Sequence, residues 1–250
     1  MFSLEGKKAI VTGAARGIGK VIAEKIAELG ASVSLADVNK ATLDETVNGL
    51  KSKGLKVIGV IMDVRDNNSI RQAIEETASA FGGLDIIVNN AGILGTSKIE
   101  DMQRDGEWNR VLDVNLSGTF FASQAALPYL KKSSAGRIIN ISSVTGRNGG
   151  FEGSMSYAAS KGGVIAITRG MARHLAPYKI TVNAVCPAAT ETDILKGYTP
   201  QQVENQCKNI LLYRLGKPEE IAGAACYLAS DEAAFVTGLM LDINGGAYFG

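Results

Sequence analysis

The fold is decided by residues 12–19, which read TGAARGIG and join a short apolar run to a longer amphipathic one. The run over residues 8–12 (KAIVT) is typical of a buried strand, and the apolar spacing over 17–29 is typical of a helix. Glycines at 13, 17 and 19 allow a tight turn and leave the backbone N–H groups open to a ligand. Because a helix N-terminus favours anions, the stretch predicts a phosphate-binding turn.

The same alternation of apolar runs and amphipathic stretches continues to the end of the chain. Near-continuous apolar strands indicate burial on both faces, and intervening helices indicate parallel crossovers. We therefore expect one α/β domain over residues 1–250, a doubly wound Rossmann-type parallel sheet of about seven strands with helices on both faces. The further strands are predicted at residues 32–36, 56–61, 84–88, 137–141, 179–185 and 239–243.

Composition excludes several classes of function. With 26 Lys and Arg against 25 Asp and Glu, the net charge of +1 argues against nucleic acid or an anionic membrane as partner. No apolar run approaches the roughly 20 residues of a membrane helix, and the N-terminus does not read as a signal peptide. Three scattered cysteines and a single histidine, His174, predict a reduced cytoplasmic protein without a metal site.

Asp37 indicates which dinucleotide the turn would bind. It ends the second predicted strand, 18 residues after Gly19, near the ~20 expected for an acid that binds a ribose 2′-hydroxyl. Its carboxylate would repel a 2′-phosphate, which favours NAD(H) over NADP(H). Two observations leave alternatives open: Arg16 beside the turn could tolerate a 2′-phosphate, and Asp37 or Asn39 could cap the helix from about Lys40, a role that can coexist with ribose binding.

Two further turns are expected at the same edge of the sheet. Asp63 and Val64 follow the third strand, and the run Asn89-Asn90-Ala91-Gly92 follows the fourth. Ligands of open α/β sheets bind at the carboxyl ends of the strands. Asp63 is a candidate for the adenine amino group, and the glycine-containing turn is a candidate to lie along the cofactor.

Tyr157 and Lys161 carry the candidate chemistry. They are four residues apart in an expected helix, so their side chains share one face. A phenol of pKa ~10 is a poor acid at neutral pH, but a neighbouring ammonium favours the phenolate and lowers the pKa. Ser143, at the end of the fifth predicted strand, could donate a hydrogen bond to the substrate oxygen.

Taken together and in order, these motifs make the chain resemble the short-chain dehydrogenase/reductase family in its single-domain form of about 250 residues. The resemblance implies that Tyr157 is the general acid/base, that Lys161 binds the nicotinamide ribose and tunes Tyr157, and that Ser143, rather than Ser142, orients the substrate. It implies that Asn115 holds a water in a proton relay. The cofactor-binding residues expected are Gly13, Arg16, Gly17, Ile18, Gly19, Asp37, Asp63, Val64, Asn90, Ala91, Gly92, Tyr157, Lys161, Pro187, Thr190 and Thr192.

The chain departs from the family pattern in two places near the expected substrate pocket. Ala188 stands where the family usually has glycine, and the Ser143-to-Tyr157 interval is one residue longer than in many members. Residues 188–215 are longer and more polar than a strand-to-helix connection requires, which predicts a substrate loop or lid. The expected neighbours of the substrate are Phe151, Met155, Ile194, Leu195 and Tyr198.

The leading hypothesis is therefore an NAD(H)-dependent oxidoreductase that interconverts a secondary alcohol and a ketone. One alternative is a 3-oxoacyl-[acyl-carrier-protein] reductase of fatty-acid synthesis, against which Asp37 counts because those enzymes usually use NADPH. The other is a non-catalytic dinucleotide sensor. The resemblance also implies a homotetramer built on the paired helices that hold Asn115 and Tyr157, near Trp108, Phe120 and Phe121.

Overall fold

The computed structural model describes residues 2–150, 155–192 and 197–250, and these form seven parallel strands in a single sheet. The strands are ordered β3-β2-β1-β4-β5-β6-β7, so the direction of winding reverses between β1 and β4. The predicted doubly wound sheet is confirmed. Its strands are β1 (Lys8–Thr12), β2 (Ser32–Asp37), β3 (Val57–Ile61), β4 (Ile86–Asn89), β5 (Arg137–Ile141), β6 (Thr181–Pro187) and β7 (Met240–Ile243).

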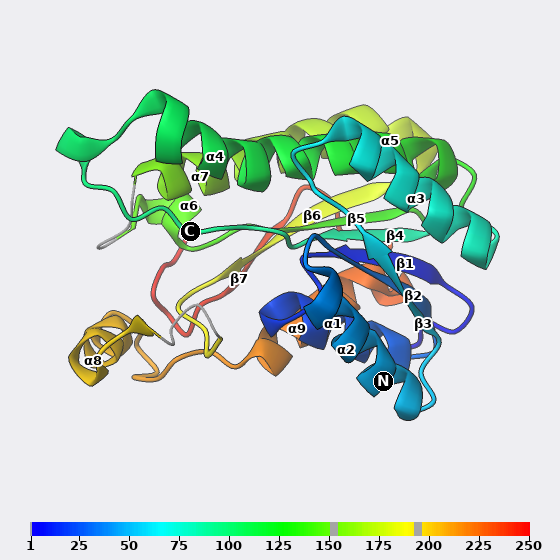
Figure 1. The fold of residues 1–250 in the computed structure, drawn as a ribbon, viewed down its shortest axis with the longest axis horizontal. Helices are drawn as coiled ribbons and strands as arrows, with labels where there is room; N and C mark the ends of the chain where they lie inside the picture. Colours follow the sequence, from blue (N-terminus) through cyan, green and yellow to red (C-terminus); the bar gives the residue numbers. More distant parts are fainter. Residues whose placement is uncertain (1, 151–154, 193–196) are drawn as a thin grey trace.

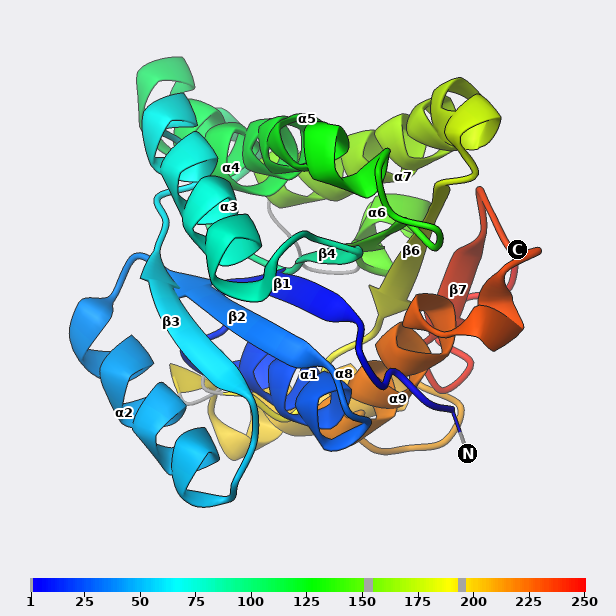
Figure 2. The same ribbon diagram turned by 90° about the vertical axis from the view of Figure 1, so that its right-hand side faces the viewer.

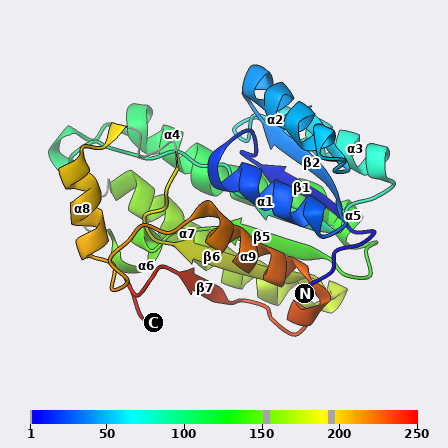
Figure 3. The same ribbon diagram turned by 90° about the horizontal axis from the view of Figure 1, so that it is seen from below.

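Helices cover both faces of the sheet (Figures 1 and 2). One layer contains α1 (Gly17–Glu28), α2 (Lys40–Ser52) and α9 (Pro218–Ala229), which lie in front of the sheet in Figure 3. The other contains α3 (Asn67–Phe81), α4 (Asn109–Leu112), α5 (Gly118–Leu130), α6 (Thr145–Asn148) and α7 (Met155–Leu175). The short α8 (Pro200–Lys208) lies beyond the carboxyl ends of the strands.

Alternation along the strands produces two hydrophobic cores. Ile10, Ile87, Ile138 and Val182 align across four neighbouring strands and face α3, α5 and α7. Their strand neighbours, such as Val11, face α1 and α9. Since the central strands β1, β4, β5 and β6 are buried on both sides, their sequences read as largely apolar runs, which explains why they were predictable. No helix in the described part of the chain is long and apolar enough to cross a membrane.

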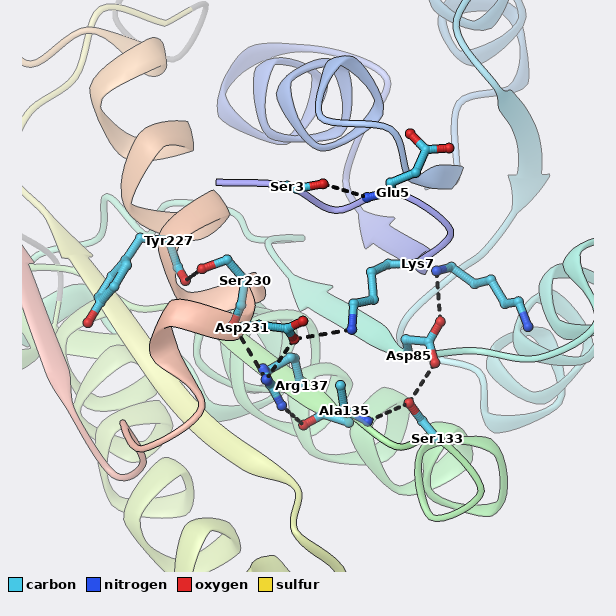
Figure 4. A network of polar contacts seen from close by, with 12 residues as sticks. Ser3, Glu5, Lys7, Asp85, Ser133, Ala135, Arg137, Tyr227, Ser230 and Asp231 are labelled. Atoms are coloured by element: carbon cyan, nitrogen blue, oxygen red, sulfur yellow. Dashed lines mark hydrogen bonds and ion pairs between the residues drawn. The ribbon is translucent and has the colours of Figure 1, made fainter. Parts of the chain in front are cut away.

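A polar network lies at the amino ends of the strands, at the end of the sheet opposite the candidate site (Figure 4). Arg137, buried at the start of β5, donates to the carbonyl of Ser230 at 3.4 Å and lies 3.6 Å from the carboxylate of Asp231. Lys7, which precedes β1, contacts the same carboxylate at 3.2 Å. These contacts hold the segment after α9 against the amino ends of β1 and β5.

Candidate active site

The phosphate turn between β1 and α1 depends on glycine where the backbone approaches the turn after β4. Gly13 has a φ of +63°, and a Cβ there would lie 2.8 Å from the Cα of Ala91. The side-chain amide of Asn90 donates to the carbonyls of Thr12 at 2.9 Å and Gly13 at 3.0 Å. Asn90 therefore fixes the shape of the turn.

The turn fits the pyrophosphate of a dinucleotide. No side-chain hydrogen bond caps the N-terminus of α1, so its first N–H groups remain available to an anion. Gly17 has a φ of +58°, and in the described part of the chain only the methyl carbon of Thr192, 4.0 Å away, comes near the position that a Cβ would take there. Ile18 is partly buried against the core beneath, which orients the start of the helix.

Asp37, at the end of β2, lies beside this turn. Its carboxylate accepts hydrogen bonds from the backbone N–H of Ala15 at 3.1 Å and of Asn39 at 3.0 Å. The cap of α2 is Asn39, whose side chain accepts from the N–H of Thr42 at 3.1 Å. The alternative in which Asp37 caps that helix is therefore wrong, and its carboxylate stays at the edge where a ribose would lie. Arg16, at the N-cap position of α1, is exposed.

Asp63, the candidate for the adenine contact, is engaged by a cation that the sequence did not single out. Arg65 donates to both oxygens of Asp63, with its Nη2 2.6 Å from Oδ2. This contact holds the pKa of the Asp63 carboxyl below its usual value. Val64 packs against α5, where a Cβ on Gly118 would lie 2.8 Å from the Val64 Cβ.

Ser143, Tyr157 and Lys161 come together beyond the carboxyl end of β5. The strand ends at Ile141, as predicted, so Ser143 lies two residues beyond the strand rather than at its last position. Lys161 is buried and donates to the Ile141 carbonyl at 2.8 Å, and its ammonium lies 5.8 Å from the centre of the Tyr157 ring. Ser142 points away, since its hydroxyl donates to the Lys161 carbonyl at 2.9 Å, whereas Ser143 hydrogen-bonds Tyr157.

Burial and hydrogen bonding act on these groups in different directions. Burial raises the pKa of the Tyr157 phenol, and the hydrogen bond with Ser143 partly reverses this. Burial lowers the pKa of Lys161 to about 8, because the ammonium is removed from water. The two pKa values thus lie farther apart than those of the free side chains, and the expected lowering of the Tyr157 pKa is wrong for the cofactor-free protein, because burial is the larger effect.

Asn115 lies within the π-helical turn Asp113–Ser117 and is fully buried. Its amide donates to the Ile93 carbonyl and to the Ser160 hydroxyl, each at 3.0 Å, and accepts from the Ile93 N–H at 2.8 Å. Its side chain therefore joins the chain after β4 to α7, and the proposed water relay stays a prediction. A Cβ on Gly92 would lie 3.3 Å from Asn115 Oδ1 and 3.5 Å from Lys161 Nζ, so glycine keeps this space open.

The segment after β6 completes the edge. Pro187 ends the strand and accepts from the N–H of Val144 at 2.9 Å. Thr190 is buried and its hydroxyl donates to the Ala188 carbonyl at 2.9 Å, whereas Thr192 reaches toward the phosphate turn. The geometry favours Thr192 of these two for contact with a cofactor.

The residues expected near the substrate fall into two groups. Phe151, Ile194 and Leu195 lie outside the described residues, and Met155 and Tyr198 are exposed. Within residues 188–215 the structure describes α8, none of whose residues is buried, and a bridge between Thr190 and Gly216. A role for this segment as a lid stays a prediction.

Two residues that sequence reasoning missed support the site. Arg147 in α6 donates to Asp242 of β7 and to the Gly250 carbonyl, each at 3.0 Å, which ties the segment after Ser143 to the end of the chain. Glu107 accepts a hydrogen bond from the Ser156 hydroxyl at the start of α7. Neither contact has a local sequence signal, because the partners are 95 to 103 and 49 residues apart. Among described residues no cluster of His, Cys, Asp and Glu could hold a metal ion.

Comparison with known proteins agrees with this geometry. Residues 13–248 match the family model described as "Enoyl-(Acyl carrier protein) reductase". Together with the sheet order and the site motifs, this match shows that the chain belongs to the short-chain dehydrogenase/reductase family, a class of oxidoreductases.

Particular relatives are similar over nearly the whole chain. The 3-oxoacyl-[acyl-carrier-protein] reductase FabG of Vibrio cholerae is 42% identical, covering 98% of this chain and 99% of that protein. The enzyme of the same name from Thermotoga maritima is 40% identical, covering 97% and 98%. A dehydrogenase/reductase from Sinorhizobium meliloti matches in structure with a TM-score of 0.94 and 39% identity, covering 99% and 97%.

Proposed function

We propose that the protein reduces the 3-oxo group of a 3-oxoacyl thioester to a 3-hydroxyacyl thioester and that it uses NADH. The observation that carries the proposal is the meeting of Ser143, Tyr157 and Lys161 at the carboxyl edge of the sheet, in a chain about 40% identical throughout to several 3-oxoacyl reductases. These relatives favour the 3-oxoacyl alternative over the broader hypothesis of an unspecified secondary alcohol.

Each residue has a defined task in this reaction. Ser143 donates a hydrogen bond to the ketone oxygen, which stabilises the negative charge that develops there. Tyr157 transfers its phenolic proton to the same oxygen. Lys161 in its protonated form stabilises the phenolate that remains. When bound, the dinucleotide would supply the hydride, with its pyrophosphate held by the phosphate turn and its adenosine ribose by Asp37.

Asp37 supports the choice of NADH. Its carboxylate, held by the N–H groups of Ala15 and Asn39, lies where a 2′-phosphate would meet a like charge. Juxtaposed like charges cost several kcal/mol. We therefore expect kcat/KM with NADH to exceed that with NADPH, and Asp37→Ser to shift the ratio toward NADPH by about tenfold or more.

The test measures nicotinamide absorbance during reduction of acetoacetyl-coenzyme A and longer 3-oxoacyl thioesters, with NADH and with NADPH. Simple ketones, oxidised sugars and ketosteroids serve as competing substrates. The proposal expects the thioesters to give the highest kcat/KM. A higher value with another ketone class would return the function to the broader secondary-alcohol hypothesis, and equal use of NADPH would contradict the role of Asp37.

A further inference from the structure

Glu107 connects two segments on either side of the candidate active site. Its Oε2 accepts hydrogen bonds from the backbone N–H of Thr96 at 2.7 Å and of Ser97 at 2.9 Å, and from the Ser97 hydroxyl at 3.0 Å. Its Oε1 accepts from the Ser156 hydroxyl at 3.0 Å. One carboxylate thus joins the loop after β4 to the first turn of α7.

The position of Ser156 gives this contact its significance. Ser156 is fully buried and directly precedes Tyr157, at the point where α7 begins. A helix end has few internal hydrogen bonds and frays easily unless side chains hold it. A charge-assisted hydrogen bond is about twice as strong as a neutral one. The contact therefore restrains the turn that carries the phenol.

The second partner of Glu107 is the loop that follows β4. Thr96 and Ser97 follow the turn that contains Gly92, and the same loop is held at Ile93 by Asn115. Asn115 in turn contacts Ser160 on α7. The loop is consequently fixed to α7 at two places, through Asn115 and through Glu107.

Glu107 itself is placed by an irregular element. It lies in the π-helical turn Arg104–Trp108, in which Gly106 departs from helical geometry with φ and ψ both at −114°. Here the turn presents a glutamate to two neighbouring segments.

We propose that Glu107 is a positioning residue, which aligns Tyr157 through Ser156 and shapes the substrate side of the site through the loop at Thr96 and Ser97. The kinetic part of this inference rests on the proposed function. The structural part does not, because it concerns hydrogen bonds within the free protein.

Hydrogen–deuterium exchange tests the structural part without a substrate. Glu107→Ala should speed exchange of the Thr96 and Ser97 amides and of the peptide over 155–161, because both anchors are lost. Ser156→Ala should affect only the peptide over 155–161. Glu100→Ala, which changes an exposed glutamate nearby, is the matched control and should leave both regions unchanged.

Kinetics with the thioester that turns over best separates the two contacts. Ser156→Ala should lower kcat about tenfold with little change in KM, because even a 1 Å displacement of a reacting group can cost up to ~100-fold. Glu107→Ala should lower kcat at least as much and also raise KM several-fold. Glu107→Gln, which can still accept from the amides and can donate to Ser156, should recover most of the loss.

The double variant Glu107→Ala/Ser156→Ala decides whether the effects share one route. Its kcat should be no lower than that of Glu107→Ala alone, since the Ser156 contact is already lost. Additive losses in kcat, or unchanged exchange at 155–161 in Glu107→Ala, would overturn the proposal. If no 3-oxoacyl thioester is reduced but exchange changes as expected, the proposed function fails and the positioning role stands.

Discussion

At the scale of single residues, Tyr157 shows how the protein prepares a weak acid for proton transfer. Its phenol lies against Ser143 and on the same helical face as the buried Lys161. Burial is the larger effect and raises the pKa of the phenol, and the hydrogen bond with Ser143 reverses only part of that rise. In the cofactor-free protein Tyr157 therefore keeps its proton at neutral pH, as a group that donates a proton to the substrate must.

We predict that Tyr157→Phe lowers kcat about 10²- to 10⁴-fold, because general acid catalysis contributes factors of that size. The ring and its packing are retained, so the Kd of NADH should change only several-fold. Stopped-flow turnover and fluorescence titration with NADH measure the two effects. More than a tenth of wild-type kcat in this variant would show that another group delivers the proton.

Lys161 permits a prediction on stability and pH. Because burial lowers its pKa from 10.5 to about 8, the unfolded chain holds one more proton than the folded chain between these values. Stability therefore rises with pH across this window. Relative to Lys161→Met, the cofactor-free wild type should gain up to about 3 kcal/mol from pH 8 to 10.5. Urea unfolding of both proteins over that range measures the difference, and a constant difference would contradict the burial of a neutral lysine.

At the scale of elements, the strands and their loops differed in how well the sequence predicted them. The bounds of β1 and β5 match the expected ranges, since residues buried on both faces leave an unbroken apolar run. The π-helical turn at Asn115 was not predicted. It is fixed by contacts with Ile93 and Ser160, which are 22 and 45 residues away. Such contacts between distant loops leave no local pattern.

The same distinction applies to the candidate site. Motifs at strand ends pointed to Asp37 and Ser143 as candidates, because the topology of a parallel sheet brings all carboxyl ends to one edge. The ion pair of Arg65 with Asp63 and the anchoring by Glu107 depend on side-chain directions in irregular segments. These directions follow from tertiary packing and cannot be read from residue type or spacing.

The contact of α6 with α7 gives a prediction at this scale. A Cβ on Gly146 would lie 2.6 Å from the backbone carbon of Lys161, so alanine there forces the two helices apart. Gly146→Ala should cost about 1–3 kcal/mol of stability and should lower kcat by displacing Ser143 from Tyr157. Gly49→Ala, in an exposed and open part of α2, is the control and should stabilise the protein by up to about 1 kcal/mol. Thermal unfolding and turnover of both variants provide the test, and equal effects at the two sites would contradict it.

At the scale of the whole molecule, the outer face of α5 and α7 carries an apolar groove that the fold itself does not cover. The groove has a volume of about 410 Å³ and is lined by Phe120, Ser123, Gln124, Leu127, Ile167, Gly170, Met171, His174 and Leu175. Phe120 and the adjacent Phe121 pack edge to face, with their ring centres 5.3 Å apart, and both remain exposed. Exposed apolar patches of this kind mark interaction surfaces.

We expect a second copy of the chain to cover this groove, as part of the homotetramer that the family resemblance implies. A two-fold axis would place the same apolar face on both partners, which is how homo-oligomers bury such patches. Light scattering should then give a mass four times the 26.2 kDa of one chain.

Met171→Glu would bury an unpaired carboxylate in the interface and should reduce the mass, whereas Ile99→Glu, at an exposed position outside the groove, should not. Because α7 also carries Tyr157 and Lys161, loss of the interface should lower kcat as well as mass. If the wild type were monomeric and fully active at micromolar concentration, the groove would serve neither assembly nor catalysis.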